Sequence, residues 1–160
     1  DIYHSANFKL DNCGFETNVT LRPQALMPRC PVTSLKVGYA YISQTRHDDV
    51  EIFKSNYAME YLRHKFVATL DHKIVSRLTA SWSFRWQQRM GSYIIYKENK
   101  STGVAHDYTP FGLLDLKLRW QAPRYELSLT MNNLTSYRYY DLGNVIQPGF
   151  WLMAGVKLKW

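Results

Sequence analysis

The chain has 160 residues, of which 15% are aromatic and 21% are charged, and its formal net charge is +7. This aromatic content argues against a disordered chain, and the lack of an unbroken apolar run of about 18 residues excludes a transmembrane helix. Two cysteines are too few for a scaffold held together by disulfides. Because the sequence starts at Asp1, without an initiator Met or an apolar leader, we expect it to be part of a longer polypeptide.

The first half of the chain alternates apolar and polar residues with the two-residue period of a β-strand. Segments 15–22 and 60–70 alternate weakly but are rich in aromatic and β-branched residues, which favour strands. Segment 35–41 alternates more clearly, with an apolar face formed by Leu35, Val37, Tyr39 and Tyr41. We predict one strand in each of these segments.

The clearest alternation runs from Ile74 to Gln87. One face of this segment is apolar except for Ser76, and the other is polar except for Val75. The apolar face comprises Ile74, Leu78, Ala80, Trp82, Phe84 and Trp86. We predict a single strand here, which at roughly 3.3 Å per residue would be about 46 Å long.

Three more strands are predicted in the second half of the chain, at 113–120, 125–132 and 150–160. Each of them has one face made almost entirely of Leu, Val, Met and aromatic residues, opposite a mixed or charged face. No segment has a convincing helical period. The sequence therefore predicts an all-β fold of about seven antiparallel strands.

The connections between these strands are of two kinds. Tight turns are predicted at 71–73 and 122–124, and long polar connections at 44–57, 91–109 and 133–148. Short and long connections alternate, except that the Pro-rich segment 22–33 is long where a short turn is expected. A membrane barrel has short periplasmic turns, long outer loops and an apolar outer surface. The pattern thus predicts antiparallel transmembrane β-barrel strands, with a soluble β-sandwich or a lipocalin-like barrel as the alternative.

Aromatic and basic residues agree with this orientation. With the tight turns on the periplasmic side, Trp120 and Trp160 fall at the inner membrane–water interface, where amphipathic rings are favoured. Phe84, Trp86 and Phe150 fall at the outer interface. The polar faces carry basic residues that we expect to line a lumen, namely Lys36, Arg77, Arg85, Lys117, Arg119, Lys157 and Lys159. Since these alternate with apolar residues and form no exposed patch, we do not expect nucleic-acid binding.

Four motifs along the chain resemble those of TonB-dependent outer-membrane receptors. Segment 108–118 resembles the third-last strand of that family, and Asn-Asn-Leu with the aromatics that follow at 132–140 resembles the exit of the penultimate strand. Pro148-Gly149 before a last strand that ends on Trp160 is similar to the closing signature of the family. Near the start, Asn7 and Gly-Phe-Glu at 14–16 resemble its asparagine loop and the start of a descending strand.

The chain departs from the family pattern at two positions. Phe150 stands where the family usually has Arg, and Trp160 stands where Phe is more common. Neither change alters the physics of a barrel strand. The run 139–149 looks most similar to the cobalamin-receptor branch of Bacteroides-type bacteria.

The resemblance implies a 22-stranded barrel around an N-terminal plug, in the outer membrane of a Gram-negative bacterium. Such a receptor imports cobalamin, a siderophore or haem with energy from the TonB complex. Residues 1–160 would supply the C-terminal portion of the barrel, about seven strands, without the plug domain or the opening strands. A self-contained eight-stranded barrel with an extra strand near Tyr3–Leu10, in a structural or adhesion role, remains the alternative.

The candidate site residues belong to the outer loops and the last strand. Aromatic side chains in loops can stack on a large flat ligand, although aromatics at strand tips are also ordinary interface residues. The ligand-binding candidates are Tyr108, Tyr137, Tyr139, Tyr140 and Asn144. The resemblance also implies an assembly signal at the end of the last strand, formed by Val156, Leu158 and Trp160.

No arrangement of residues points to an enzyme, a metal site or a bound cofactor. The five histidines are scattered without metal-ligand spacing. His47-Asp48-Asp49 is better explained as a solvated loop tip than as a cation site. Cys13 and Cys30 fall at opposite ends of the predicted strands, so we do not expect them to form a disulfide.

Overall fold

The computed structural model describes residues 9–46, 61–97, 100–143 and 145–159. Within these ranges the chain forms nine strands and one short 3₁₀ helix. They are β1 (Leu10–Leu21), η1 (Pro23–Ala25), β2 (Val32–Arg46), β3 (Leu62–Val75), β4 (Leu78–Arg89), β5 (Ser92–Lys97), β6 (Lys100–Asp107), β7 (Phe111–Gln121), β8 (Tyr125–Asn132) and β9 (Trp151–Leu158). The described residues include no helix that is long and apolar enough to cross a bilayer.

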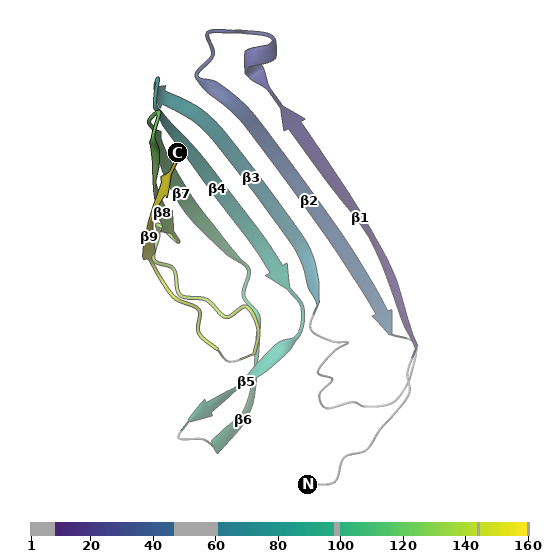
Figure 1. Ribbon diagram of the computed structural model, residues 1–160. Coiled ribbons are helices and arrows are strands. Elements are labelled where there is room, and N and C mark those ends of the chain that lie inside the picture. Colours follow the sequence, from purple (N-terminus) through teal and green to yellow (C-terminus); the bar gives the residue numbers. More distant parts are fainter. Residues whose placement is uncertain (1–8, 47–60, 98–99, 144, 160) are drawn as a thin grey trace.

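Seven of the strands form one antiparallel sheet in the order β1-β2-β3-β4-β7-β8-β9. Strands β5 and β6 form a separate hairpin that is inserted between β4 and β7 (Figure 1). Each strand of the main sheet pairs with its neighbour along the chain once this hairpin is set aside. The prediction of an all-β fold with about seven antiparallel strands is confirmed.

Apart from the Pro-rich connection between β1 and β2, the described connections of the sheet are sorted by length between its two ends (Figure 1). The turns β3–β4 and β7–β8 lie at one end, while β5, β6 and the segment that joins β8 to β9 lie at the other (Figure 1). The Pro-rich connection between β1 and β2 also lies at the short-turn end. It is compacted by η1 and by the hydrogen bond that Cys30 N donates to Met27 O, 2.9 Å.

The register of the sheet separates an apolar face from a polar face. One row across five strands consists of Val19, Val37, Ala68, Phe84 and Leu114. The next row, one residue further along each strand, consists of Thr20, Lys36, Thr69, Ser83 and Asp115. Because side chains alternate across a pleated sheet, these rows face opposite sides.

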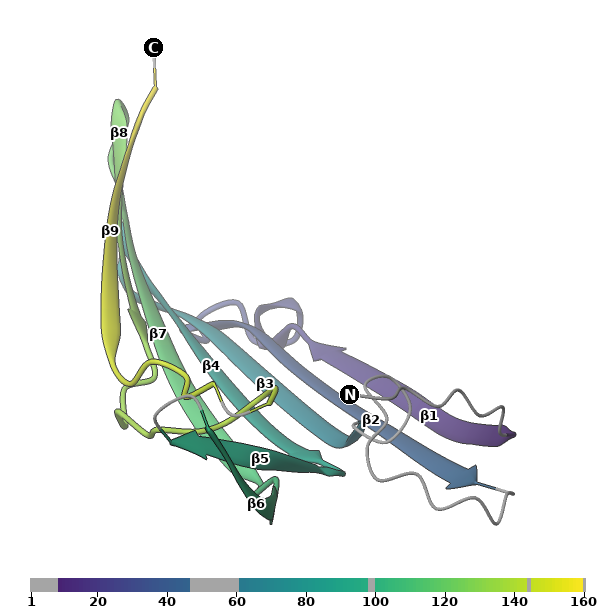
Figure 2. The same cartoon turned by 90° about the horizontal axis from the view of Figure 1, so that it is seen from below.

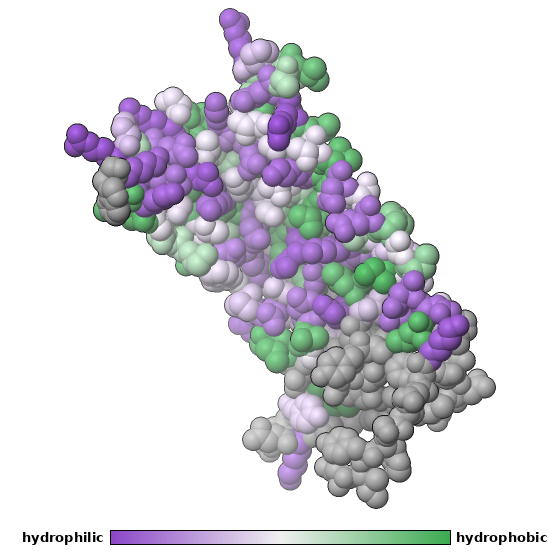
Figure 3. Space-filling model, turned by 45° about the vertical axis from the view of Figure 1, so that its right-hand side comes forward, coloured by the Kyte–Doolittle hydropathy of each residue, from purple (hydrophilic) through white to green (hydrophobic). Residues whose placement is uncertain are grey.

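The sheet is curved like a section of a tube, as the view from below shows (Figure 2). Figure 3 looks onto the concave face, where hydrophilic residues gather along the strands. The apolar rows therefore lie on the convex face, and many of their large side chains are exposed, among them Phe15, Val19, Phe84, Leu127 and Val156. An apolar convex face and a polar concave face are the arrangement of a membrane-barrel wall.

An aromatic belt crosses β1 to β4 on the convex face, in the half nearer the long connections. Its ring centroids are 5.9 Å apart for Phe15 and Tyr41, 5.0 Å for Tyr41 and His64, and 6.3 Å for His64 and Trp86. The hydroxyl of Tyr39 lies 2.7 Å from His64 Nδ1, so the imidazole has a polar partner within the belt. This is the level at which Trp86 was expected to meet the outer interface.

The β3–β4 turn corrects one prediction. The sequence predicted a turn at 71–73 and one strand over Ile74–Gln87, but β3 continues to Val75 and the chain turns at Ser76-Arg77. A register shift between Lys73 and Val75 changes which face the side chains point to just before the turn. The alternation of apolar and polar residues in the sequence therefore continues through the turn. In addition, Ser76-Arg77 contains neither the Gly nor the Asn that marks a two-residue hairpin.

The connection predicted at 91–109 is also different, because it contains the hairpin of β5 and β6. Ile94 pairs with Ala105, and Tyr93 pairs with His106. The residues 93–96, Tyr-Ile-Ile-Tyr, have strong β-propensity, which outweighs the polar residues around them.

Strands β1 and β9 are the outer strands of the described sheet, and they do not pair with each other. The curved sheet therefore does not close into a small barrel by itself within the described residues. The additional strand near Tyr3–Leu10, which an eight-stranded barrel would require, falls almost entirely outside the described residues.

Candidate functional site

The segment 133–150, which joins β8 to β9, folds back over the concave face at the long-connection end of the sheet. Under it lie the most buried side chains of this face, including Phe111, Leu113 and the amide of Gln87, which is only 3% exposed. The concave side of a single curved sheet has no second layer to cover it, so the segment supplies the cover. The candidate site is therefore the 133–150 segment packed against the concave face of the sheet.

Asn133 holds the two ends of this segment together. Its backbone N–H donates to Asp115 Oδ1 at 2.7 Å, which attaches it to β7. Its side-chain amide donates to the carbonyls of Tyr137 at 2.7 Å and Pro148 at 3.2 Å, and its Oδ1 accepts from Tyr137 N at 3.0 Å and Thr135 Oγ1 at 3.2 Å. Buried polar groups of this kind stabilise a loop when all their hydrogen bonds are made.

Asp141 fastens the middle of the segment to β4. Its Oδ1 accepts a hydrogen bond from Gln87 Nε2 at 2.6 Å and lies 3.3 Å from a guanidinium nitrogen of Arg89. The Arg89 guanidinium also stands 6.0 Å from the ring centroid of Tyr108. The buried amide of Gln87 and the charge of Arg89 thus both find partners in one loop carboxylate, which offsets the cost of burying them.

An aromatic cluster lies beside this carboxylate. Tyr140 stacks on Tyr93 with a centroid distance of 4.7 Å, and Tyr93 is 5.2 Å from Tyr108. On the neighbouring side, Tyr139 lies 4.1 Å from Phe111. The hydroxyl of Tyr108 accepts a hydrogen bond from Gly143 N at 2.7 Å. Rings from the hairpin, from the start of β7 and from the loop therefore meet at one place.

Tyr93 lies on β5, beyond the long strands. Burial raises the pKa of its hydroxyl, and the neighbouring Tyr140 raises it further. His106 on β6 is 6.0 Å from the Tyr93 ring. Tyr93 therefore offers a neutral, hydrogen-bonding aromatic surface at physiological pH.

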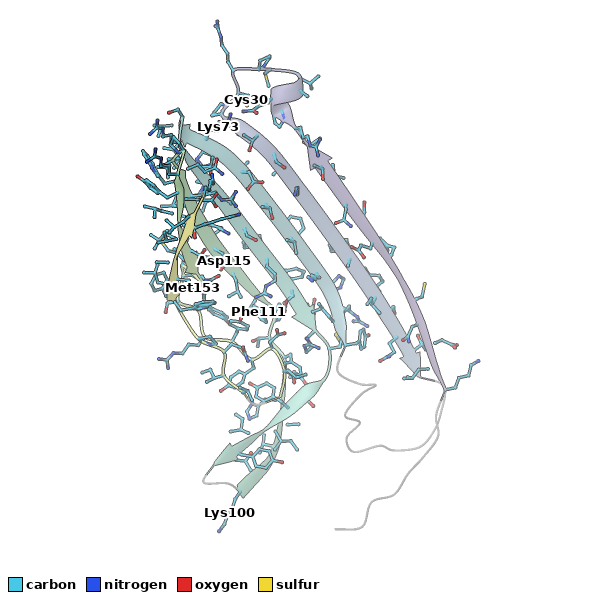
Figure 4. All side chains as sticks on the ribbon, in the orientation of Figure 1. Cys30, Lys73, Lys100, Phe111, Asp115 and Met153 are labelled. Atoms are coloured by element: carbon cyan, nitrogen blue, oxygen red, sulfur yellow. The ribbon has the colours of Figure 1, made fainter. Side chains whose placement is uncertain are left out.

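From the predicted ligand-binding set, the fold brings Tyr108 and Tyr140 together against Tyr93, while Tyr139 packs on Phe111 on the neighbouring side. Tyr137 has a different role in the described structure, since its backbone binds Asn133 and its side chain is 44% exposed. Asn144 lies outside the described residues. Figure 4 shows Phe111 and Asp115, to which this loop is fastened, following one another along β7.

Sequence reasoning missed three residues of this site, namely Tyr93, Arg89 and Asp141. Tyr93 lies within 91–109, which the sequence predicts to be a long polar connection, and Arg89 lies just before that segment. The run of aromatic and β-branched residues at 93–96, Tyr-Ile-Ile-Tyr, was the available signal for the hairpin. No local sequence pattern marked Asp141, because its partners are distant in the chain. Gln87 is 54 residues away and Arg89 is 52 residues away.

The residues of the expected assembly signal lie on the last strand. Val156 and Leu158 are 70% and 64% exposed on the convex face of β9, and Trp160 lies outside the described residues.

Cys13 and Cys30 are free cysteines in the described structure. Cys13 pairs with Ser43 near the long-connection end, whereas Cys30 lies at the opposite, short-turn end (Figure 4). Among the described residues there is no group of three or more His, Cys, Asp and Glu side chains that could hold a metal ion. The segment His47-Asp48-Asp49 lies outside the described residues.

No known protein family matches the sequence, and no curated protein matches it. The fold, however, is similar to that of the FrpB iron transporter from Neisseria meningitidis (F3-3 variant), with a TM-score of 0.66 and 19% sequence identity. The match covers 92% of this chain and 23% of the transporter chain. At this identity the similarity concerns the fold: the curved seven-stranded sheet resembles one section of that transporter.

Proposed function

We propose that this chain is the C-terminal part of the barrel of a TonB-dependent outer-membrane receptor, which imports a scarce ligand and is not an enzyme. The observation that supports this most strongly is the two-faced curved sheet, apolar on its convex side and polar on its concave side, with the β3–β4 and β7–β8 turns at one end and the described β4–β7 and β8–β9 connections at the other. These are the properties of a barrel wall in the outer membrane of a Gram-negative bacterium.

Strand length and the outer strands support the same proposal. Strands β1 to β4 contain 12, 15, 14 and 12 residues, more than the roughly 9–11 that cross a bilayer when tilted. The backbone groups along the outer edges of β1 and β9 need partners, because lipid cannot supply hydrogen bonds. We infer that strands elsewhere in the same protein complete the barrel, and that an N-terminal plug domain fills its lumen and contacts the TonB complex.

The ligand is proposed to bind at the outer end, where Tyr108 and Tyr140 meet Tyr93 and Tyr139 lies against Phe111, with Tyr137 and Asn144 on the same segment. Flat ring surfaces suit a large conjugated ligand. The likeness to an iron transporter favours an iron chelate or haem, while the resemblance of segment 139–149 favours cobalamin. Direct binding measurements with each ligand can distinguish between these possibilities.

The last strand is proposed to carry the assembly signal. If Val156 and Leu158 are recognised during insertion, replacing both with Asp should lower the amount of folded receptor in the outer membrane. Replacing Lys157 with Asp, on the opposite face, should have a smaller effect. Heat-modifiable migration on gels reports the folded fraction in each case.

The proposed function is tested with the full-length receptor in detergent, titrated with cyanocobalamin, haem and ferric siderophores. We expect saturable binding of one ligand class, weakened at least tenfold by Tyr140→Ala and little changed by Tyr125→Ala in the β7–β8 region, an exposed tyrosine at the other end of the sheet. The absence of binding by every ligand, together with solubility of the receptor without detergent, would contradict the proposal.

A further inference from the structure

The net charge of the chain is concentrated at the short-turn end of the sheet. This end comprises the β1–β2 connection and the β3–β4 and β7–β8 turns, each with the four residues on either side, and residues 156–159 (Figure 1). Of the 20 Lys and Arg of the chain, eight lie here, against one of the 13 Asp and Glu. The other residues carry 12 charges of each sign, so the formal net charge of +7 belongs to this end.

Four of these cations lie in the connections themselves, beyond the strands. They are Arg22, Arg29, Arg77 and Arg124, and all four are exposed. Their guanidinium groups have no ion pair or hydrogen bond with any residue that the structure describes. Glu126, the single acid of this end, is already engaged by Arg119 at 3.4 Å. The described part of the chain therefore does not neutralise the charge of this end.

The apolar convex face ends where these cations begin. On β1 the exposed Leu21 is followed directly by Arg22, and on β8 the exposed Tyr125 comes directly after Arg124. Both apolar side chains belong to rows of the convex face. An apolar surface with cations along its edge is typical of a membrane–water interface, because long basic side chains extend from the apolar region to the headgroups.

The Pro-rich connection between β1 and β2 is an ordered part of this end. Gln24 Nε2 donates a hydrogen bond to Cys30 O at 3.0 Å, which closes the connection on itself. The backbone N–H of Lys73 donates to Pro31 O at 2.8 Å and so attaches the connection to β3. Figure 4 shows Cys30 and Lys73 together at this end of the sheet.

This ordered connection holds two apolar side chains away from the rest of the chain. Leu26 is 87% exposed and Met27 is 59% exposed, and Arg22 and Arg29 flank them in the sequence. Exposed apolar side chains on a fixed backbone, bordered by polar groups, mark an interaction surface. The partner must therefore offer apolar groups as well as negative charge.

We propose that the short-turn end binds anionic phospholipids, with Arg22 and Arg29 on the phosphate groups and Leu26 and Met27 in the apolar edge of the leaflet. The inference rests on the proposed function, which places the sheet in a membrane. A phospholipid satisfies both halves of the surface, since guanidinium groups bind phosphate and acyl chains cover apolar side chains. A soluble anion or a nucleic acid would pair with the cations and leave Leu26 and Met27 in water.

The test compares phosphatidylglycerol with phosphatidylcholine as ligands of the full-length receptor in detergent, with native mass spectrometry to count the bound lipids. The charge variant combines Arg22→Gln with Arg29→Gln, and the apolar variant combines Leu26→Ser with Met27→Ser. We expect the wild type to prefer phosphatidylglycerol. The charge variant should lose at least tenfold of its affinity for that lipid alone, since each cation near an anionic surface contributes about fivefold. The apolar variant should bind both lipids more weakly, because burial of its side chains no longer contributes.

The matched control combines Lys100→Gln with Arg138→Gln, two exposed cations at the long-connection end (Figure 4). It removes the same charge and should bind both lipids as the wild type does. Heat-modifiable migration on gels confirms that each variant is folded.

Three outcomes overturn the inference. One is equal affinity of the wild type for the two lipids, and another is the same loss of phosphatidylglycerol in the control as in the charge variant. The third is displacement of phosphatidylglycerol by inorganic phosphate at constant ionic strength, which would assign the cations to a soluble anion. A receptor that is soluble without detergent contradicts the proposed function itself, whereas a detergent-dependent receptor without preference for phosphatidylglycerol contradicts this inference alone.

Discussion

At the scale of single residues, Asn133 combines a backbone role with a side-chain role. Its φ of 51° lies in the left-handed region, which asparagine and glycine adopt more readily than other residues. At the same time its amide group makes four hydrogen bonds with the 133–150 segment. Substitutions can separate the two roles.

Asn133→Gly keeps the backbone freedom and removes the side-chain hydrogen bonds, whereas Asn133→Ala loses both. We expect the glycine variant to destabilise the closed loop by about 2 kcal/mol and the alanine variant by about 3 kcal/mol, because buried carbonyls and an N–H lose their partners. Hydrogen exchange of the amides in 134–148 measures this. Equal protection in the wild type and in both variants would show that the loop is held elsewhere.

Asp141 is the second residue whose substitution is informative. Asp141→Ala leaves the buried Gln87 amide without its partner and should open the middle of the loop by about 2 kcal/mol. Asp141→Asn retains an acceptor for Gln87 but loses the charge that pairs with Arg89, so its effect should be about half as large. Protease cleavage within 139–147 reports the opening, and cleavage rates that do not differ among the three proteins would refute the role of this carboxylate.

The sequence was informative about some of these residues and silent about others. Tyr108, Tyr139 and Tyr140 stood out because aromatic residues in polar connections are conspicuous. Asp141 and Arg89 did not, because a carboxylate in a loop and an arginine at a strand end are ordinary until the fold brings them within 3.3 Å of each other. Long-range pairs of this kind depend on the curvature of the sheet, which no local pattern encodes.

At the scale of elements, the face of the strand on which a residue lies determines how much a substitution lowers the stability of the folded receptor. Ala68 lies in an apolar row of the convex face, between Val37 and Phe84. Ser83, beside Phe84 on β4, lies in a polar row of the concave face. In the proposed barrel, the side chain of Ala68 faces lipid and the side chain of Ser83 faces water.

We therefore expect Ala68→Arg to destabilise the receptor in lipid vesicles by about 2–4 kcal/mol, and Ser83→Arg, which faces the lumen, by less than about 1 kcal/mol. Urea titration of the folded receptor in vesicles measures both. Equal costs for the two substitutions would contradict the assignment of the convex face to lipid.

The strands also show how well the two-residue period of apolar and polar residues predicts strand bounds. It located 125–132 with the bounds of β8, because tight turns and loop residues flank that strand. It misplaced the β3–β4 turn, because the register shift before Val75 preserved the alternation through Ser76-Arg77. Neither of these residues has a positive φ, so the turn requires no glycine or asparagine and leaves no mark in the sequence.

At the scale of the whole molecule, the alternation of faces was predictable, and so was the sorting of the described connections by length apart from the Pro-rich β1–β2 connection, because both follow from the proposed boundary between lipid and water. The closure of the sheet was not predictable from the residues described. Strands β1 and β9 remain its outer strands, and the 22-stranded barrel is implied only by the family resemblance.

The most direct test of the central claim is a cysteine scan along β4 in the full-length receptor, reconstituted in bilayers, with Cys13 and Cys30 replaced by Ser. Nitroxide labels at 79–87 are probed with a lipid-soluble and a water-soluble relaxing agent. The account predicts strict alternation, with labels at Ala80, Trp82 and Phe84 accessible from lipid and labels at Ser81, Ser83 and Arg85 accessible from water. Accessibility to the water-soluble agent at every position would contradict a membrane-spanning wall.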